Sequence, residues 1–234
     1  MYKGKKILAT ICARGGSKGV KNKNIRLLNG IPLIAYSLNV AKSSSLVDNY
    51  VVSTDSDEII SVVRNLGYKV GFKRPDELAG DNVSRIDAIQ HAVRWMEKNN
   101  ETKYDIIADL GVATPLKSVE DLDNSIRLCI DNDFENVFSV CPCIKNPYFN
   151  MVEVINDRVK LVKEYYEIKT RQKAPKVYEM NDGFNVWIPK ALFSSNPQFN
   201  KTTSIYVMPR ERSVDIDEEQ DFSIAEAILK ESGI

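Results

Sequence analysis

A short segment near the N-terminus, RGGSKG at residues 14–19, combines backbone freedom with positive charge, and KNKN follows at 21–24. Glycine lets backbone N–H groups turn toward phosphate oxygens, while Arg and Lys add charge-assisted hydrogen bonds that suit a polyanion. The spacing fits neither the GxxxxGK[ST] loop nor the GxGxxG fingerprint. We therefore predict a triphosphate-binding loop of another type, with a flexible turn carrying solvated lysines as the alternative.

Two carboxylates near the C-terminus, Asp215 and Asp217, lie two residues apart. In an extended backbone, residues i and i+2 project to the same side, so both carboxylates would face one point. Magnesium takes one or two carboxylates and completes its shell with water and phosphate oxygens. The pair is therefore expected to hold Mg²⁺ beside a triphosphate. The alternative is that Asp217 caps the last helix and Asp215 is solvated.

Composition and charge exclude several classes of protein. The 32 basic and 32 acidic side chains cancel, which argues against nucleic acid or an anionic membrane as a partner. A membrane span needs roughly 18 apolar residues in a row, and the chain has no such run. The N-terminus lacks the pattern of a secretion signal, so we expect a cytoplasmic protein with reduced cysteines. With His91 as the single histidine, a mechanism that needs several histidines is excluded.

Short apolar runs alternate with amphipathic segments along the chain. Runs rich in Ile, Val and aromatic residues predict strands at 6–13, 50–54, 104–110, 136–140 and 205–208. Helices are expected from Pro32 through Leu38, from a cap at Asp55 or Ser56 to before Gly67, and over 84–98, 118–130 and 218–231. This order predicts an α/β fold with a mostly parallel twisted sheet covered on both faces. Ligands bind such sheets at the C-terminal ends of the strands.

The alternation breaks after Cys143, where two Val/Ile-rich runs and a charged segment follow without a clear helix. This stretch is typical of a small antiparallel excursion. We therefore divide the chain into a first α/β part at 1–143, an excursion at 144–182, and a part at 183–234 that completes the α/β domain.

Five segments, in this order and spacing, resemble the acylneuraminate cytidylyltransferases, also called CMP-sialic acid synthetases. They are ICARGGSKG at 11–19 with Lys23 and Asn24, VSTD at 52–55, RPDELA at 74–79, TPL at 114–116 and SVDID at 213–217. The resemblance spans nearly the whole chain and implies a three-layer α/β/α nucleotidyltransferase fold. It also implies a homodimer in which the excursion contacts the partner subunit.

The activity implied by the resemblance is transfer of CMP from CTP to the anomeric hydroxyl of an acidic nine-carbon sugar, with release of pyrophosphate. The implied nucleotide-binding residues are Arg14, Gly16, Ser17, Lys18, Lys23, Asn24 and Arg74. Lys18, Asp215 and Asp217 would be catalytic, and both aspartates would bind Mg²⁺. Ser53, Thr54 and Asp55 are interpreted as only a strand end and a helix cap.

In the sugar half, the resemblance points to Gly111, Asn185 and Arg171, and Arg171 would act across the dimer interface on the sugar carboxylate. The N-acetylneuraminate enzymes have a Gln where this chain has Gly111, an Asn-Gly-Ala where it has Asn181-Asp182-Gly183, and a lysine near Phe149. The nucleotide half is thus retained while the sugar half differs. We therefore predict a related bacterial nonulosonate as acceptor, and the loop at 11–24 looks most like the enzymes that activate N,N'-diacetyllegionaminic acid.

Two rival hypotheses remain at the level of sequence. The first is the sister reaction on 3-deoxy-manno-octulosonate, whose enzymes share the fold but have a less glycine-rich opening. The second is a nucleotide-binding regulator without catalysis, against which the Asp215 and Asp217 pair argues.

Overall fold

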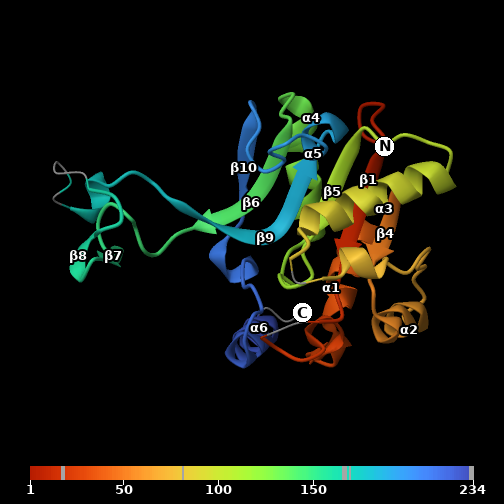
Figure 1. The fold of residues 1–234 in the computed structure, drawn as a ribbon, viewed down its shortest axis with the longest axis horizontal. Helices are drawn as coiled ribbons and strands as arrows, with labels where there is room; N and C mark the ends of the chain where they lie inside the picture. Colours follow the sequence, from red (N-terminus) through yellow and green to blue (C-terminus); the bar gives the residue numbers. More distant parts are fainter. Residues whose placement is uncertain (17–18, 81, 165–167, 169, 232–234) are drawn as a thin grey trace.

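The computed structural model describes residues 1–16, 19–80, 82–164, 168 and 170–231, and in these residues a six-stranded sheet forms the centre of the molecule (Figure 1). The strand order is β10-β6-β9-β5-β1-β4. The strands are β1 (Ile7–Cys12), β4 (Asn49–Ser53), β5 (Ile106–Leu110), β6 (Asn136–Pro142), β9 (Tyr178–Trp187) and β10 (Thr203–Val207). The pairs β1–β4, β1–β5 and β10–β6 are parallel, whereas β9 runs antiparallel to both β5 and β6.

Helices cover both faces of this sheet, and two hydrophobic clusters fill the two interfaces. One cluster joins the sheet to α1 (Leu33–Ser43), α2 (Asp57–Asn65), α4 (Val119–Asp131) and α6 (Glu219–Glu231). The other joins it to α3 (Arg85–Asn99) and α5 (Pro189–Leu192). The predicted α/β fold with a mostly parallel sheet between two helical layers is therefore confirmed.

Helix α4 illustrates how the sequence specifies these elements. Its buried residues Leu122, Ile126 and Cys129 recur at helical spacing, which gives one apolar face against the sheet. The Ser118 side chain accepts a hydrogen bond from the backbone N–H of Asp121, and the Asp121 carboxylate accepts one from the backbone N–H of Ser118. This capping box fixes the first turn of the helix.

The parallel strands β1, β4, β5 and β6 end at one edge of the sheet, and the loops that leave them carry most of the predicted site residues. Strand β9 runs in the opposite direction, so its first residues lie at this same edge. The edge therefore brings together the segments after Cys12, Ser53 and Leu110 and the segment around Asp182. Among the described residues, no helix has the length and apolar composition that crossing a membrane requires.

The excursion after Pro142 forms an arm that projects away from the body (Figure 1). It contains an antiparallel hairpin of β7 (Val152–Ile155) and β8 (Arg158–Leu161). The chain returns through β9, which pairs with β6 from Tyr178 onward, so the last residues of the 144–182 range belong to the central sheet. A short hairpin of β2 (Leu27–Leu28) and β3 (Ile31–Pro32) and the helix α5 were not among the predicted elements.

Candidate active site

A cavity of about 510 Å³ lies at the edge where the parallel strands end. Its wall combines basic side chains from distant segments with one carboxylate and with the helix α3. The predicted residues that line it are Arg14, Lys23, Asn24, Arg74 and Asp217. The structure thus brings together four residues that were predicted to bind the nucleotide and one that was predicted to bind the metal.

The loop after β1 is anchored by its neighbours. The backbone N–H of Gly15 donates to Asp55 Oδ1 at 3.1 Å, and the buried Asn24 donates from Nδ2 to the backbone oxygen of Arg14 at 2.9 Å. A Cβ atom at Gly19 would lie 2.2 Å from the backbone oxygen of Asp217, so this close approach requires glycine. Gly16 is exposed beside the cavity wall. Ser17 and Lys18 lie outside the described residues.

Lys23 connects the loop to the carboxylate segment, almost two hundred residues later in the chain. Its Nζ donates to the backbone oxygen of Ile216 at 2.5 Å and to Asp217 Oδ1 at 3.0 Å. The Asp217 side chain is 74% exposed, so its carboxylate remains accessible from the cavity. The backbone N–H groups of Asp217 and Glu218 donate to Asp221 Oδ2. Asp221, rather than Asp217, therefore caps this end of α6.

Asp215 is partly buried and, unlike Asp217, does not line this cavity. Its Oδ1 atom is buried and has no hydrogen-bond partner among the described residues. Burial, followed by the negative charges of Asp217 and Asp182, raises the pKa of Asp215 to about 6. A buried carboxylate oxygen without a donor, repelled by a second carboxylate, fits a divalent cation with oxygen ligands.

Three or more His, Cys, Asp or Glu side chains do not converge on any metal-sized point within the described part of the chain. A fully protein-made metal cage is therefore absent there. Magnesium bound through one or two carboxylates needs no such cage, because substrate oxygens and water supply the other ligands.

Arg74, one of the residues predicted to bind the nucleotide, is only 5% exposed. Its Nε donates to Ser53 Oγ at 2.9 Å and its Nη2 to the backbone oxygen of Ser53 at 2.5 Å. The backbone N–H of Arg74 also donates to the backbone oxygen of Thr54 at 2.7 Å. Three oxygen atoms of Ser53 and Thr54 therefore position Arg74 and its buried guanidinium at the cavity wall.

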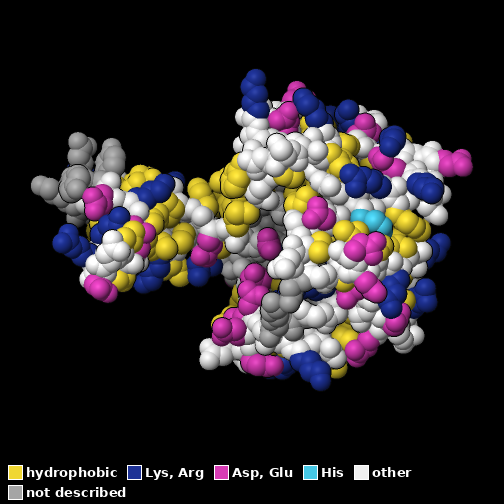
Figure 2. Space-filling model, viewed as in Figure 1, with side chains coloured by type: hydrophobic (Ala, Val, Ile, Leu, Met, Phe, Trp, Pro, Cys, Tyr) yellow, Lys and Arg dark blue, Asp and Glu magenta, His cyan; other side chains and the backbone are white. Residues whose placement is uncertain are grey.

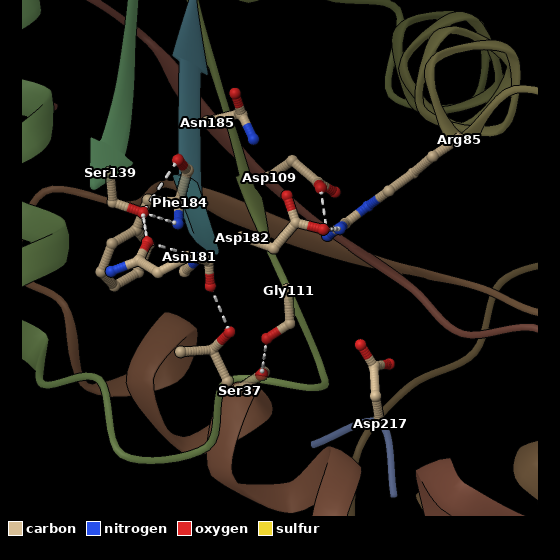
Figure 3. Close-up of polar contacts among 12 residues, drawn as sticks. Ser37, Arg85, Asp109, Gly111, Ser139, Asn181, Asp182, Phe184, Asn185 and Asp217 are labelled. Carbon is tan, nitrogen blue, oxygen red and sulfur yellow. Dashed lines mark hydrogen bonds and ion pairs between the residues drawn. The ribbon is translucent and has the colours of Figure 1, made fainter. Parts of the chain in front are cut away.

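On the other side of the cavity, Arg85 reaches from the first turn of α3 toward two carboxylates (Figure 3). Its Nη2 lies 2.6 Å from Asp109 Oδ2, and its Nη1 lies 3.4 Å from Asp182 Oδ2. Asp109 is 1% exposed, and its Oδ1 accepts from Thr10 Oγ1 at 2.6 Å. Burial raises the pKa of Asp109, and the Arg85 guanidinium opposes that effect.

Gly111 and Asn185 both lie near this group. Gly111 follows β5, and its backbone oxygen accepts hydrogen bonds from Ser37 Oγ at 3.0 Å and from Lys117 Nζ. Asn185 faces Asp109 across the antiparallel β5–β9 pair, so both side chains project to one face of the sheet. The structure therefore places two of the three predicted sugar-side residues on the same side of the site.

Arg171 lies away from this cavity, on the arm. It lines a groove of about 620 Å³ that the arm forms with the end of β6, and its Nη2 donates to the backbone oxygen of Ile144 at 3.3 Å. Within one chain, Arg171 therefore cannot act together with Arg74 or Asp217.

Several residues at the site were missed from the sequence or given a smaller role. Ser53 and Asp55 anchor Arg74 and the glycine loop, although the sequence gave them only the roles of strand end and cap. Arg85 and Asp109 were not selected at all. The sequence did contain a signal for this pair, because Asp109 interrupts an apolar run that predicts a buried strand. A carboxylate buried in such a strand requires a partner.

Comparisons with known proteins agree with this geometry. A family model described as Cytidylyltransferase matches residues 8–208. CMP-N,N'-diacetyllegionaminic acid synthase of Campylobacter jejuni subsp. jejuni is 41% identical over 223 residues, which cover 95% of this chain and 94% of that protein. A pseudaminic acid cytidylyltransferase of the same subspecies is 32% identical, covering 96% of this chain and 97% of that protein.

A solved structure gives an independent comparison of the fold. CMP:2-keto-3-deoxy-manno-octonic acid synthetase, complexed with CTP, matches with a TM-score of 0.72 over 97% of this chain and 99% of that chain, at 15% identity. The family model covers most of the chain, and both sequence relatives align over nearly their full lengths. The chain therefore belongs to the cytidylyltransferase family.

Proposed function

We propose that this protein transfers CMP from CTP to the anomeric hydroxyl of an acidic nine-carbon sugar and releases pyrophosphate. The observation that carries the proposal is the convergence of Arg14, Lys23, Asn24 and Arg74 with Asp217 around one cavity. Basic and amide donors on one side suit a triphosphate, and an accessible carboxylate at its edge suits the metal that accompanies it.

In this proposal the chain's own residues mainly position and neutralise charge, as phosphoryl transfer generally requires. Arg14, Ser17, Lys18 and Lys23 hold the triphosphate, and Asn24 and the fixed guanidinium of Arg74 select the cytidine. Asp215 and Asp217 hold Mg²⁺, which supplies charge neutralisation at the phosphates when bound. One of these two carboxylates would take the proton of the attacking hydroxyl.

The acceptor that we propose is N,N'-diacetyllegionaminic acid. The 41% identical relative named for that sugar supports this choice over the sugar named for the 32% identical relative. The likeness to the octulosonate enzyme concerns the fold, at 15% identity, and gives that acceptor less support. The reaction consumes CTP, and we propose that the enzyme acts in the cytoplasm.

We further propose that the enzyme works as a homodimer through the arm. The hairpin has one apolar face, where Val154 and Val159 stand opposite each other and are both 68% exposed. Figure 2 shows hydrophobic side chains on the surface of the arm. An isolated two-stranded hairpin is at best marginally stable in water, so a partner for this face is expected. Burying it against a second subunit would also bring Arg171 to a partner's sugar pocket.

The test is a substrate panel with the purified full chain, CTP and MgCl₂. N,N'-diacetyllegionaminate, pseudaminate, N-acetylneuraminate and 3-deoxy-manno-octulosonate are supplied separately, pyrophosphate release is followed, and the product is identified by mass spectrometry. We expect the CMP-sugar of N,N'-diacetyllegionaminate at the highest kcat/KM. CTP binding without pyrophosphate release from any sugar would instead support the regulator hypothesis.

A further inference from the structure

Among the described residues, Arg85 is the cavity-lining cation to which the proposed nucleotide and metal sites assign no role. It comes from the first turn of α3 and extends across the ends of β5 and β9 (Figure 3). Its side chain is 35% exposed, so part of the guanidinium faces the cavity.

The position of this guanidinium is fixed by a buried carboxylate. Asp109 is held between Thr10 Oγ1 at 2.6 Å and Arg85 Nη2 at 2.6 Å, and it has almost no contact with solvent. Burying a carboxylate is costly unless it is paired and hydrogen-bonded. Asp109 therefore retains Arg85 in one orientation, and each group is costly to remove alone.

Arg85 still has hydrogen-bonding capacity to offer a ligand. Its Nε is buried, so a ligand can reach only the outer N–H groups of the guanidinium. Its Nη1 lies 3.4 Å from Asp182 Oδ2, which is a loose contact, and the Asp182 side chain is 54% exposed. Arg85 Nη1 and the Asp182 carboxylate therefore offer an N–H donor and an acceptor side by side, and the contact between them is weak enough to be shared with a ligand.

The space beside Gly111 indicates which part of the substrate this pair would meet. A Cβ atom at Gly111 would lie 1.9 Å from the backbone oxygen of Asp182 and 3.5 Å from Arg85 Nη2. The backbone of Asp182, with a φ of 51°, and the guanidinium of Arg85 thus occupy the space that a side chain at position 111 would need. The resemblance described above assigns Gly111 to the sugar side of the site, at a position where the N-acetylneuraminate enzymes have a glutamine.

The charges around Arg85 and Asp182 indicate what kind of substrate group these two side chains would bind. Arg85 carries one positive charge, while Asp109 and Asp182 carry two negative charges, so the group as a whole repels the sugar carboxylate. A neutral carbonyl oxygen has no such penalty and accepts from an N–H donor. Amide carbonyls of acylamino substituents are groups of this type.

We propose that Arg85, held by Asp109, recognises the acceptor sugar by donating to the carbonyl oxygen of an acylamino substituent, while Asp182 accepts from a neighbouring N–H or hydroxyl. The proposal rests on the proposed function and adds a specificity-determining group to it. A site built to hydrogen-bond a substrate group discriminates strongly against analogues that lack the group, because its own polar atoms are then left unpaired.

The test uses two variants and one control in the full chain. Arg85→Gln combined with Asp109→Asn removes the guanidinium without leaving a buried charge unpaired, and Asp182→Asn weakens the acceptor while keeping its shape. Arg64→Gln, an exposed position on α2, is the matched control. For each protein, KM is measured for N,N'-diacetyllegionaminate at saturating CTP and for CTP at saturating sugar.

We expect the double variant to raise the sugar KM about tenfold or more, with a smaller rise for Asp182→Asn and a CTP KM within about twofold of wild type. An equal rise in both KM values, or an unchanged sugar KM in a folded double variant, would overturn the proposal. If wild type released no pyrophosphate with any of the four sugars, the proposed function itself would be wrong, and the assignment of Arg85 would be rejected with it. If wild type turns over and the variants keep the wild-type sugar KM, only the proposed role of Arg85 would be rejected.

Discussion

Lys23 and Asp217 show how single residues join parts of this site that are far apart in sequence. The ammonium of Lys23 holds both the backbone of Ile216 and the carboxylate of Asp217, so the triphosphate loop and the carboxylate segment form one unit. In the proposed function, this carboxylate would bind the cation that accompanies the nucleotide. Its removal is therefore expected to affect catalysis more than folding.

Replacing Asp217 with Asn is expected to lower kcat/KM about 100-fold or more at saturating MgCl₂, because a neutral amide is a poor magnesium ligand. The melting temperature should stay close to that of wild type, since the side chain is 74% exposed. Steady-state kinetics over a MgCl₂ titration measures the effect. Glu218→Gln, which neutralises the adjacent exposed carboxylate, serves as the control, and an unchanged magnesium dependence in Asp217→Asn would reject the assignment.

Lys117 gives a prediction about pH and stability. It is 4% exposed, its Nζ donates to the backbone oxygen of Thr114 at 2.5 Å, and burial lowers its pKa to about 7. In the unfolded chain its pKa is near the ordinary 10.5, so between these two values the unfolded state binds more protons. The contribution of Lys117 to stability therefore rises with pH in this window.

The measurement compares the free energy of unfolding of wild type and Lys117→Met by urea denaturation at pH 7.0 and 8.5. Wild type should gain about 2 kcal/mol relative to the variant across this interval, at 1.36 kcal/mol per pH unit. The exposed control Lys98→Met should show no such change relative to wild type. A wild-type advantage that stays constant with pH would show that Lys117 keeps its proton in the folded state.

Sequence reasoning identified the residues whose side-chain type alone indicates a chemical role. Arg14, Lys23, Asn24, Arg74 and Asp217 do line one cavity. It gave Ser53 and Asp55 only local structural roles and did not select Arg85 and Asp109, because the importance of these four residues depends on the side chains and backbone atoms that they contact. Their partners come from other strands and helices, and only the assembled edge of the sheet brings them together.

The junction between β5 and β9 is the element on which the shape of the sugar side depends. The backbone of Asp182 passes so close to Gly111 that no other residue fits there without displacing a strand. This contact couples two departures from the N-acetylneuraminate enzymes, the glycine at 111 and the aspartate at 182. We therefore expect position 111 to be limited by backbone packing.

Gly111→Ala should lower the free energy of unfolding by about 1–3 kcal/mol, because the added methyl group overlaps backbone atoms that cannot rotate away. Urea or thermal denaturation measures the loss. Gly16→Ala is the matched control, since a Cβ atom there would meet nothing within 4 Å. Equal stability of the two variants would show that β9 yields easily at Asp182.

Among the elements, those with a strong hydrophobic period were predicted well. The five parallel strands β1, β4, β5, β6 and β10, the helices α2, α3 and α4, and the final helix lie within a few residues of their expected positions. The central place of β9 was not predicted, because the order of strands in a sheet depends on which surfaces remain to be covered. The hairpin β2–β3 and the helix α5 are too short to show a period.

At the scale of the whole molecule, the arm makes the chain asymmetric, with a body that contains the nucleotide cavity and a projection that carries Arg171 (Figure 1). An exposed apolar hairpin face of this kind typically marks an interaction surface. The homodimer that we propose would complete each sugar site with an arginine from the partner subunit.

The double variant Val154→Asp with Val159→Asp should therefore sediment as a monomer and lose most sugar-dependent pyrophosphate release, because opposed carboxylates cannot be buried in an apolar interface. Analytical ultracentrifugation and CTP binding measured together separate loss of assembly from loss of folding. Ile224→Asp, at a 50% exposed site on α6, controls for a general effect of a new surface charge. A wild-type monomer, or a variant that remains dimeric, would contradict the dimer proposal.

The late position of β9 in the chain also constrains how the protein is made. Strand β6 pairs with β9 and β10, both of which follow it in sequence, and β9 separates β6 from β5. A nascent chain that has released β6 must still add the residues up to 187 before β9 can join β6 to β5. At elongation rates of about 5–20 residues per second, that interval lasts roughly 2–9 seconds. During it the edges of β5 and β6 stay unpaired and open to aggregation, so the arm also sets a delay in the folding of the body during synthesis.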